Sequence, residues 1–414
     1  MAEVALWWLA VELLGLVALP AALLLFRNLP DKGYVFSKPL AIVVLAYLSW
    51  LLGMLHVLPN TRWSIVLLAA VLAILSGGLF WRHRGQMAAF LKQNLGLIVA
   101  TEGLFAFAFV LWAAVRAYTP EIAGTEKPMD FAFLNGILRS RYFPPNDPWL
   151  SGHSISYYYF GHLMMAMLTK LTGVLPAVGY NLGLALVFAL TALGAFGVVY
   201  NLVRHFDKRG AGRAIGFGLV AAGLVVLAGN LEGVLELAYA HGVGSQGFWQ
   251  WLGIKGLEHP YHSVHWYPTD YWWWWRSSRV IDTVSNGVSL DYTIQETPSF
   301  SFLLGDLHPH VMALPFVLMA LGFCLNTYLS DSPLGLTWLK RSPLHYLAVV
   351  LSIGALGFLN SWDLPTYLLL FVIAVFFASY FRNGELNGAV FKEVIITAVL
   401  LGLGAVILYL PFYG

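Results

Sequence analysis

The sequence predicts an all-α polytopic membrane protein with about ten or eleven transmembrane helices, a class indicated by composition and by apolar run length. Of the 414 residues, 59% are hydrophobic and 11% are charged, whereas soluble globular proteins carry about 25% charged residues. Apolar runs of about 18 or more residues, which can cross a hydrocarbon core of roughly 30 Å, recur along the chain. The composition excludes a water-soluble domain, and a net charge of +2 excludes a nucleic-acid partner.

Ten apolar runs are clear candidate spans, and the first is too long for a signal peptide. They are expected at residues 4–26, 39–58, 63–81, 94–118, 176–203, 214–240, 309–330, 343–360, 364–382 and 391–412. The run 155–172 is left open as a full crossing or a short helix. Asn230 and Glu232 indicate that the span 214–240 reaches the surface near residue 230.

Lysine and arginine orient the predicted spans, because cytoplasmic loops carry an excess of them. Five loops hold these residues: Arg27, Lys32 and Lys38; Arg82, Arg84 and Lys92; Arg204, Lys208, Arg209 and Arg213; Lys340 and Arg341; Arg382 and Lys392. All five are cytoplasmic if the N terminus is outside and residues 155–172 form a short or re-entrant helix. The protein is then a multi-pass cell-membrane protein whose long loops 119–154 and 241–308, and corner 360–363, are extracytoplasmic.

The loop 119–154 is expected to contain a short amphipathic helix from Pro128 to about Arg139, because proline favours the first turn. Glu126 and Asp130 are four residues apart and share a face at its start, where the helix dipole favours anions. Such a pair suits general-base catalysis or cation binding, although acids there are most often capping groups. The other candidate substrate contacts in this loop are Arg139, Arg141 and His153.

Three consecutive tyrosines, Tyr157, Tyr158 and Tyr159, stand at the start of the segment 155–172. An interfacial aromatic belt and a substrate contact both fit this pattern. His162 would lie about one and a half turns below Tyr157 in a helix. An ionisable group at that depth is either a functional candidate or a hydrogen-bonded structural histidine.

The second long loop, with the residues that directly follow it, holds half of the twelve histidines and a run of four tryptophans. These histidines are His241, His259, His262, His265, His308 and His310, and the tryptophans are Trp249, Trp251, Trp266 and Trp272–Trp275. Aromatic rings of this kind either stack on the apolar faces of sugars or lie at the membrane interface. The sequence does not separate these two roles.

The most specific unit runs from Glu296 to His310 and ends directly before a predicted span. Asp306, His308 and His310 alternate, so their side chains point to one side of an extended segment. Two imidazoles and a carboxylate can bind a divalent metal such as Mg²⁺ or Mn²⁺, or bind and protonate a phosphate. Glu296, and Asp363 in the corner 360–363, join these residues as candidate substrate contacts.

Three acids lie inside predicted spans: Glu12, Glu102 and Glu236. Each is costly in a membrane unless it is paired or lies near a helix end. Glu12 is the deepest, and the sequence suggests no partner for it. A proton or ion path through the three acids is an alternative role.

Several motifs together resemble the uncharacterised YYY membrane protein family over roughly residues 94–412. They are TEKPMD from Thr125, FPPNDPW from Phe143, YYYFGH from Tyr157, GDLHPH from Gly305 and NSWD from Asn360. More distantly, the loop pattern and span layout are similar to the GT-C fold of integral membrane glycosyltransferases. This resemblance implies a GT-C-like membrane domain at residues 94–414 after an N-terminal three-helix extension at residues 1–93.

The GT-C resemblance implies transfer of a sugar from a polyprenyl-phosphate-linked donor to an acceptor on the outer face. Glu126 would be the catalytic acid of the first loop and Asp130 the second choice, although Lys127 and Pro128 stand where a second acid is common. Enzymes of this type sometimes use a divalent metal, here held by Asp306, His308 and His310. The donor lipid would lie between spans, with its phosphate near Arg139, Arg141, His308 or His310.

A non-catalytic structural or assembly subunit of a larger membrane complex is the alternative, with the Trp-rich loop as its docking surface. An enzyme would bring the first-loop acids to face the segment 306–310, whereas a scaffold would use these groups as helix caps. A transporter would need polar residues at mid-span, and these are sparse.

Overall fold

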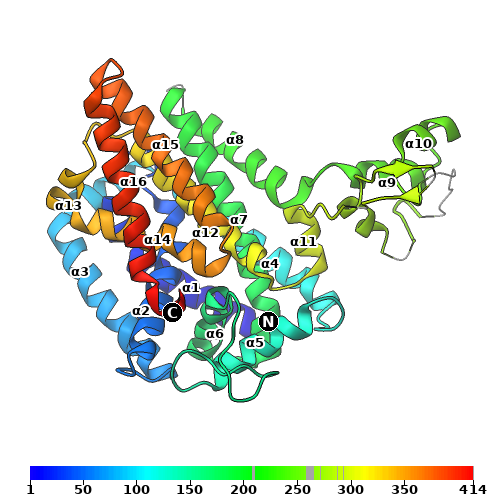
Figure 1. The fold of residues 1–414 in the computed structure, drawn as a ribbon, viewed down its shortest axis with the longest axis horizontal. Helices are drawn as coiled ribbons and strands as arrows, with labels where there is room; N and C mark the ends of the chain where they lie inside the picture. The colour runs from blue at the N-terminus through cyan, green and yellow to red at the C-terminus, as the bar shows by residue number, and fades with distance from the viewer. Residues whose placement is uncertain (208–209, 258–264, 271, 287, 292, 414) are drawn as a thin grey trace. The chain divides into compact units, whose positions relative to one another are not determined.

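The computed structural model describes residues 1–207, 210–257, 265–270, 272–286, 288–291 and 293–413. His259 and His262, and the basic residues Lys208 and Arg209, lie outside these ranges. The described chain is mainly helical, with one short antiparallel hairpin (Figure 1). The predicted all-α class is therefore confirmed.

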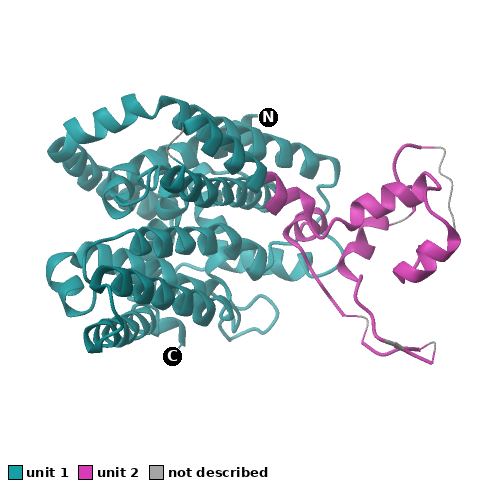
Figure 2. Ribbon diagram, turned by 90° about the horizontal axis from the view of Figure 1, so that it is seen from above, with its two compact units in different colours: residues 1–222, 306–414 teal, residues 223–305 magenta. Residues whose placement is uncertain are grey.

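The described residues form two compact units, residues 1–222 with 306–414 and residues 223–305 (Figure 2). The helices of the first unit are α1 (Ala2–Leu25), η1 (Tyr34–Phe36), α2 (Ser37–Met54), α3 (Arg62–Gln93), α4 (Leu95–Tyr118), α5 (Lys127–Arg139), α6 (Phe160–Thr172), α7 (Pro176–Phe206), α8 (Ala211–Gly223, ending at the unit boundary), α12 (Pro309–Tyr328), α13 (Leu336–Arg341), α14 (Pro343–Leu359), α15 (Asp363–Asn383), α16 (Gly388–Leu408) and α17 (Leu410–Tyr413). The division expected at residue 93 does not coincide with a boundary between these units. Within the first unit, α1 packs on α6 and α7, and α2 packs on α6 and α12.

Nine helices in the described ranges are long and apolar enough to cross a membrane, which supports a multi-pass membrane protein. They start and end close to the predicted spans, except that α3 continues to Gln93 and the span that begins at Ala211 ends at Ala228. The predicted span 343–360 forms α14, whose 17 residues make it too short for this group. The predicted span 214–240 is not continuous, and its helix breaks near residue 230, where it was expected to reach the surface. There α8 passes into the π-helix η2 (Leu224–Ala228), and Gly229 and Leu231 adopt positive φ before α9 begins.

The segment 155–172 forms the short helix α6 and not a full span. Its 13 residues rise about 20 Å, which is less than a hydrocarbon core of roughly 30 Å. Gly161 lets this helix approach α12 closely, since a β-carbon there would lie 2.7 Å from the sulfur of Met312. The next residue, His162, is fully buried and faces Asp130 of α5.

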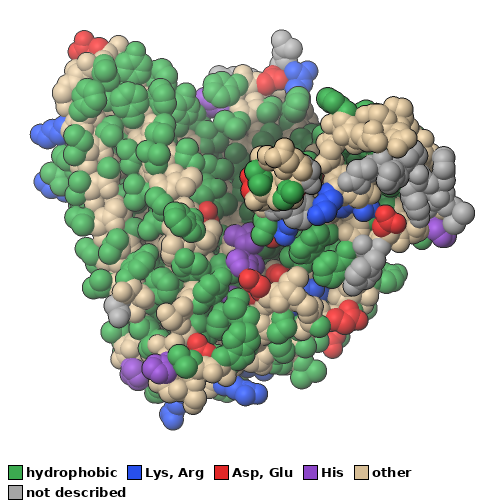
Figure 3. Space-filling model, turned by 45° about the vertical axis from the view of Figure 1, so that its right-hand side comes forward, with side chains coloured by type: hydrophobic (Ala, Val, Ile, Leu, Met, Phe, Trp, Pro, Cys, Tyr) green, Lys and Arg blue, Asp and Glu red, His purple; other side chains and the backbone are tan. Residues whose placement is uncertain are grey.

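The long helices of the first unit divide into an inner and an outer set. The apolar stretches of α7, α12 and α2 are 89%, 78% and 72% buried, whereas those of the other long helices are at most 33% buried. Large apolar side chains such as Ile74 and Trp81 are exposed on the outer set. Figure 3 shows hydrophobic side chains over most of the visible face, as expected for a surface that contacts lipid tails.

A buried charged group joins α1, α2 and α4. Lys38 Nζ lies 3.1 Å from Glu12 Oε2 and 2.6 Å from Glu102 Oε2, and Tyr34 donates a hydrogen bond to Glu102 at 2.9 Å. Lys38 was expected in a basic loop, but it lies in the first turn of α2 and its side chain is 4% exposed. It is also the partner of Glu12 that the sequence did not suggest.

The second unit has its own small core, formed by Tyr239, Trp249, Ile254 and Leu257. Its elements are η2, α9 (Glu232–Ala240), α10 (Gln246–Leu252), η3 (Trp273–Ser278), β1 (Val284–Ser285), β2 (Val288–Ser289) and α11 (Pro298–Leu304), with Val284 opposite Ser289 in the hairpin. Arg276 binds Glu236 at 2.6 Å. Part of the Trp-rich loop, including Trp249, therefore forms the hydrophobic core of a folded unit.

Candidate functional site

Glu126 and His308 bring the first loop and the segment 306–310 together. They occupy the N-cap positions of α5 and α12, yet within the described chain neither side chain makes a capping hydrogen bond. Instead, Glu126 Oε2 lies 2.8 Å from His308 Nε2. The two side chains therefore face each other and do not act as caps of their helices.

His308 also contacts His310, through the ring nitrogen that does not face Glu126. Their Nδ1 atoms lie 2.5 Å apart. The direction of this hydrogen bond depends on the tautomers of the two rings: if His308 Nε2 carries the proton that faces Glu126, then His308 Nδ1 accepts from His310. The three residues thus form a chain of hydrogen bonds that starts at an exposed acid.

Tyr157 lies beside the Glu126 and His308 pair, with its hydroxyl 3.5 Å from His308 Nε2. Burial of the ring raises the pKa of Tyr157 to about 12, and the negative charges of Glu126 and Asp130 add to this shift. Tyr157 is therefore a neutral hydrogen-bond donor at physiological pH. Figure 3 shows histidine and acidic side chains gathered in one area of a largely hydrophobic face.

Asp306 is held by the first loop as well. The hydroxyl of Thr125 lies 3.0 Å from each of its carboxylate oxygens, and the next residue, Leu307, donates its backbone N–H to the hydroxyl of Tyr180 at 3.1 Å. Asp306 is only 5% exposed. Burial raises its pKa to about 6, against the opposing effect of the Thr125 hydrogen bond.

Asp130 and His162 form a second acid–histidine pair, which is buried. Asp130 Oδ1 lies 3.2 Å from His162 Nε2, and both side chains are fully buried between α5 and α6. Asp130 Oδ2 and His162 Nδ1 have no hydrogen-bond partner among the described residues. The two acids predicted to share a face thus differ in access, because Glu126 is 55% exposed and Asp130 is not exposed at all.

Two cations that the sequence analysis missed lie near Asp306. Arg116, in the last turn of α4, is 3% exposed and donates to Asn181 at 3.0 Å, while its Nη2 has no partner in the described part of the chain. Lys127 opens α5, and burial lowers its pKa. Asp306 interacts electrostatically with both. For Arg116, the signal in the sequence was its position at the end of a span next to a functional loop.

The structure leaves other first-loop candidates away from this group. Arg139 ends α5, about 18 Å along the helix from Lys127. The guanidinium of Arg141 lies 5.6 Å from the ring centre of Tyr142. His153 is exposed in a turn, where its backbone carbonyl accepts from Asp147.

The remaining candidates have different surroundings. Tyr159 is buried and its hydroxyl accepts from Trp50 at 3.1 Å, and Tyr158 packs against Tyr157. Asp363 begins α15, accepts from Asn360 at 3.1 Å and interacts electrostatically with His310. Glu296 belongs to the second unit, where it accepts from Ser301 at 3.3 Å.

Asp306, His308 and His310 do not fit the divalent metal that was considered for them. No group of three or more His, Cys, Asp or Glu side chains in the described ranges is arranged to hold a metal ion. Both ring nitrogens of His308 face other side chains, and Asp306 is turned to Thr125. The three side chains therefore do not converge on one point.

Comparison with known proteins gives a family but not an activity. No curated protein matches the chain in sequence, and no solved structure matches it. A family model described as an uncharacterised membrane protein, DUF2298, matches residues 44–414. This match includes part of the N-terminal region that the resemblance had left outside, and it fits the expected YYY type of membrane protein. The chain belongs to the uncharacterised membrane protein family DUF2298.

Proposed function

We propose that the protein transfers a sugar from a polyprenyl-phosphate-linked donor to an acceptor hydroxyl, with Glu126 as the general base. The observation that carries this proposal is the 2.8 Å contact between Glu126 Oε2 and His308 Nε2, made by two N-cap residues that do not cap their helices. This contact uses one carboxylate oxygen and leaves Oε1 for the acceptor. Asp130 is the weaker candidate base because it is fully buried.

The neighbouring donors orient the base in this proposal. His308 donates to Glu126 and fixes the direction of its carboxylate, while His310 holds the other side of the His308 ring. Tyr157 stays protonated because its pKa is raised to about 12, so its hydroxyl can donate to the acceptor or to a sugar oxygen. Positioned groups of this kind contribute to general-base catalysis by lowering the cost of orientation.

Arg116 and Lys127 are the proposed partners of the phosphate leaving group. As the bond between the acceptor oxygen and the anomeric carbon forms, the bond from that carbon to the phosphate oxygen breaks. The acceptor proton passes to Glu126, and the electron pair leaves with the lipid phosphate. That phosphate gains negative charge, which the buried Arg116 and the nearby Lys127 stabilise.

The test is a transfer assay with the purified full chain, labelled polyprenyl-phosphate sugars and a panel of acceptors. Glu126→Gln should lower transfer by about 10²–10⁴-fold, the usual contribution of general-base catalysis. Glu385→Gln is the matched control, because it removes an exposed acid that contacts Asn387 and should leave the rate unchanged. Wild-type rates in both Glu126→Gln and Asp130→Asn would show that neither acid is the base.

A docking subunit is the second candidate, favoured by the exposed indoles of Trp251 and Trp266, which are 79% and 75% exposed. Large exposed aromatic side chains are enriched in protein interfaces. This function predicts that Trp251→Ala with Trp266→Ala abolishes co-purification with a membrane partner, while Glu126→Gln has no effect in cells. The opposite pattern supports the transferase.

A further inference from the structure

A cavity of about 640 Å³ lies at the C-terminal end of α12, far from His308. The 20 residues of α12 rise about 30 Å, so the cavity and the Glu126 and His308 pair lie at opposite ends of one helix. The walls come from α1, α3, α12, α13 and α14 and from loop residues near them. The polar and aromatic residues that line it include Arg27, Asn326, Thr327, Trp338, Arg341 and His345.

The charge in this cavity is positive. Arg27 and Arg341 are both exposed side chains that line it, and Arg27 Nη2 lies 3.5 Å from the hydroxyl of Ser332. None of the described residues that line the cavity is acidic. Two guanidinium groups on one open cavity are suited to a phosphate, which arginine binds through parallel N–H groups.

Buried polar side chains form the floor of the cavity. Asn326 is 2% exposed, and it accepts from the backbone of Asn28 at 3.0 Å and donates to the carbonyl of Leu25 at 3.2 Å. Trp338 Nε1 donates to His345 Nδ1 at 2.9 Å. Thr327 is 3% exposed, lines the cavity, and has a hydroxyl without a hydrogen-bond partner within the described ranges. That hydroxyl is a buried polar atom of a residue that lines the cavity.

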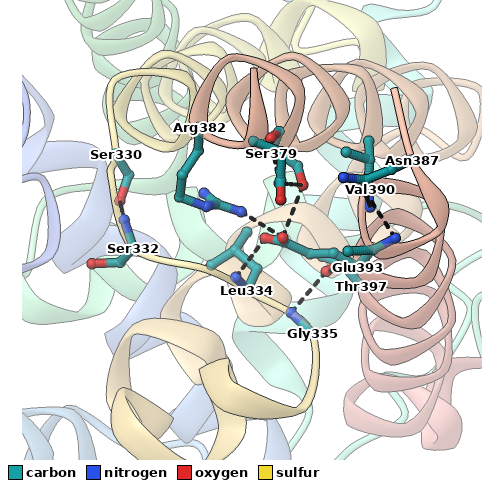
Figure 4. Close-up of polar contacts among 12 residues, drawn as sticks. Ser330, Ser332, Leu334, Gly335, Ser379, Arg382, Asn387, Val390, Glu393 and Thr397 are labelled. Atoms are coloured by element: carbon teal, nitrogen blue, oxygen red, sulfur yellow. Dashed lines mark hydrogen bonds and ion pairs between the residues drawn. The ribbon is translucent and has the colours of Figure 1, made fainter. Parts of the chain in front are cut away.

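The segment between α12 and α13 forms one wall of the cavity, and Glu393 of α16 accepts a hydrogen bond from it (Figure 4). The backbone N–H of Leu334 donates to Glu393 Oε1 at 2.7 Å, and Arg382 binds Glu393 Oε2 at 2.5 Å. The backbone N–H of Gly335 donates to Thr397 at 3.0 Å. Because Arg382 neutralises Glu393, this nearby acid does not oppose an anion in the cavity.

An apolar groove of about 170 Å³ continues from the cavity between α1, α2 and α3. The two spaces share the lining residues Ala21, Leu25 and Leu79. Along α1 the groove extends from Leu25 to Leu14, a rise of about 17 Å. Apart from Ser76, its described lining is aliphatic, so it is suited to a hydrocarbon chain.

We propose that the cavity and groove together bind one anionic membrane lipid, whose phosphate headgroup carries a net negative charge. The phosphate would contact Arg27 and Arg341, and one acyl chain would lie in the groove along α1. The continuity of a cationic cavity with an aliphatic groove selects a lipid over a soluble anion, because a soluble anion makes no use of the groove. This site does not depend on the transfer reaction proposed for the other end of α12.

The experiment uses the purified full chain in phosphatidylcholine nanodiscs with a photoactivatable phosphatidic acid, and maps the labelled peptides by mass spectrometry. Labelling is expected in residues 14–25 and 69–79, which line the groove. Arg27→Gln with Arg341→Gln should reduce this labelling about tenfold, as expected for the loss of charge-assisted hydrogen bonds to a phosphate. Ala18→Phe, which fills the groove and keeps both arginines, should reduce it as well.

The matched control is Arg82→Gln with Arg84→Gln, which removes two charges from α3 near the same end of the unit without touching the cavity lining. It should leave labelling within about twofold of the wild type. Equal losses in both double variants, or equal labelling by photoactivatable phosphatidylcholine, would overturn the proposal. Full displacement by inorganic phosphate would instead identify a soluble-anion site and would also overturn it.

Discussion

The two ends of α12 carry polar groups that are organised in opposite ways. At the N-terminal end, Glu126 pairs with His308 and Asp306 binds Thr125. At the C-terminal end, Arg27 and Arg341 line an open cavity that has no acidic residue in its described lining. The first end has a network in which each group holds another in place, which suits chemistry on a reacting atom. The second has uncompensated positive charge and empty space, which suits retention of an anionic ligand.

The largest loss of stability is expected from Asp130→Ala at the N-terminal end. It leaves His162 fully buried without its carboxylate, and breaking such a pair costs about 3–5 kcal/mol of unfolding free energy. Thermal unfolding in detergent measures the loss, with the exposed Asp331→Asn as control. A melting temperature equal to that of the control would mean that the buried pair does not organise this end.

Asp306 should make stability depend on pH. Its folded pKa is raised to about 6 from 3.8, so the folded state keeps a proton that the unfolded chain releases above about pH 4. Stability should therefore fall by up to about 3 kcal/mol as pH rises from about 4 to about 6, and then stay level. Asp306→Asn should remove this slope in thermal unfolding measured across the same range. An unchanged slope in the variant would assign it to another group.

A smaller effect is expected from the cation beside Asp306. Lys127→Gln should lower sugar transfer by about 10–100-fold, because it removes one positive group from the leaving phosphate. Arg139→Gln, at the other end of α5, should leave the rate unchanged. If Arg139→Gln were the more damaging variant in the same assay, the phosphate would lie at the end of α5 that the sequence first suggested.

Local elements were predictable from the sequence where one residue type decides them. Pro128 and the amphipathic pattern predicted a helix to Arg139, and α5 covers Lys127–Arg139. Asn230 and Glu232 predicted that the span 214–240 surfaces near residue 230, and the structure places there the break between α8 and α9. Both signals act within a few residues of one another, so no knowledge of the packing was needed.

Contacts between distant segments were less predictable. Lys38 was interpreted as a loop charge, since its partners Glu12 and Glu102 are brought to it only by packing of α1 and α4 against α2. Arg139 and Arg141 were chosen as phosphate partners from loop position, whereas the direction of α5 brings Lys127 near Asp306. The cavity at Arg27 was not predicted, because its walls come from five separate helices.

The central claim is that the N-terminal end of α12 is the reaction site and the C-terminal end is a lipid site. The most direct measurement is an experimental density map of the full chain in nanodiscs that contain a polyprenyl-phosphate sugar and phosphatidic acid. We expect one phosphate within hydrogen-bond distance of Arg116 or Lys127, with the sugar beside Glu126, and a second phosphate between Arg27 and Arg341. A sugar-bearing lipid at Arg27 and Arg341, with no ligand density at Glu126 and His308, would contradict the account.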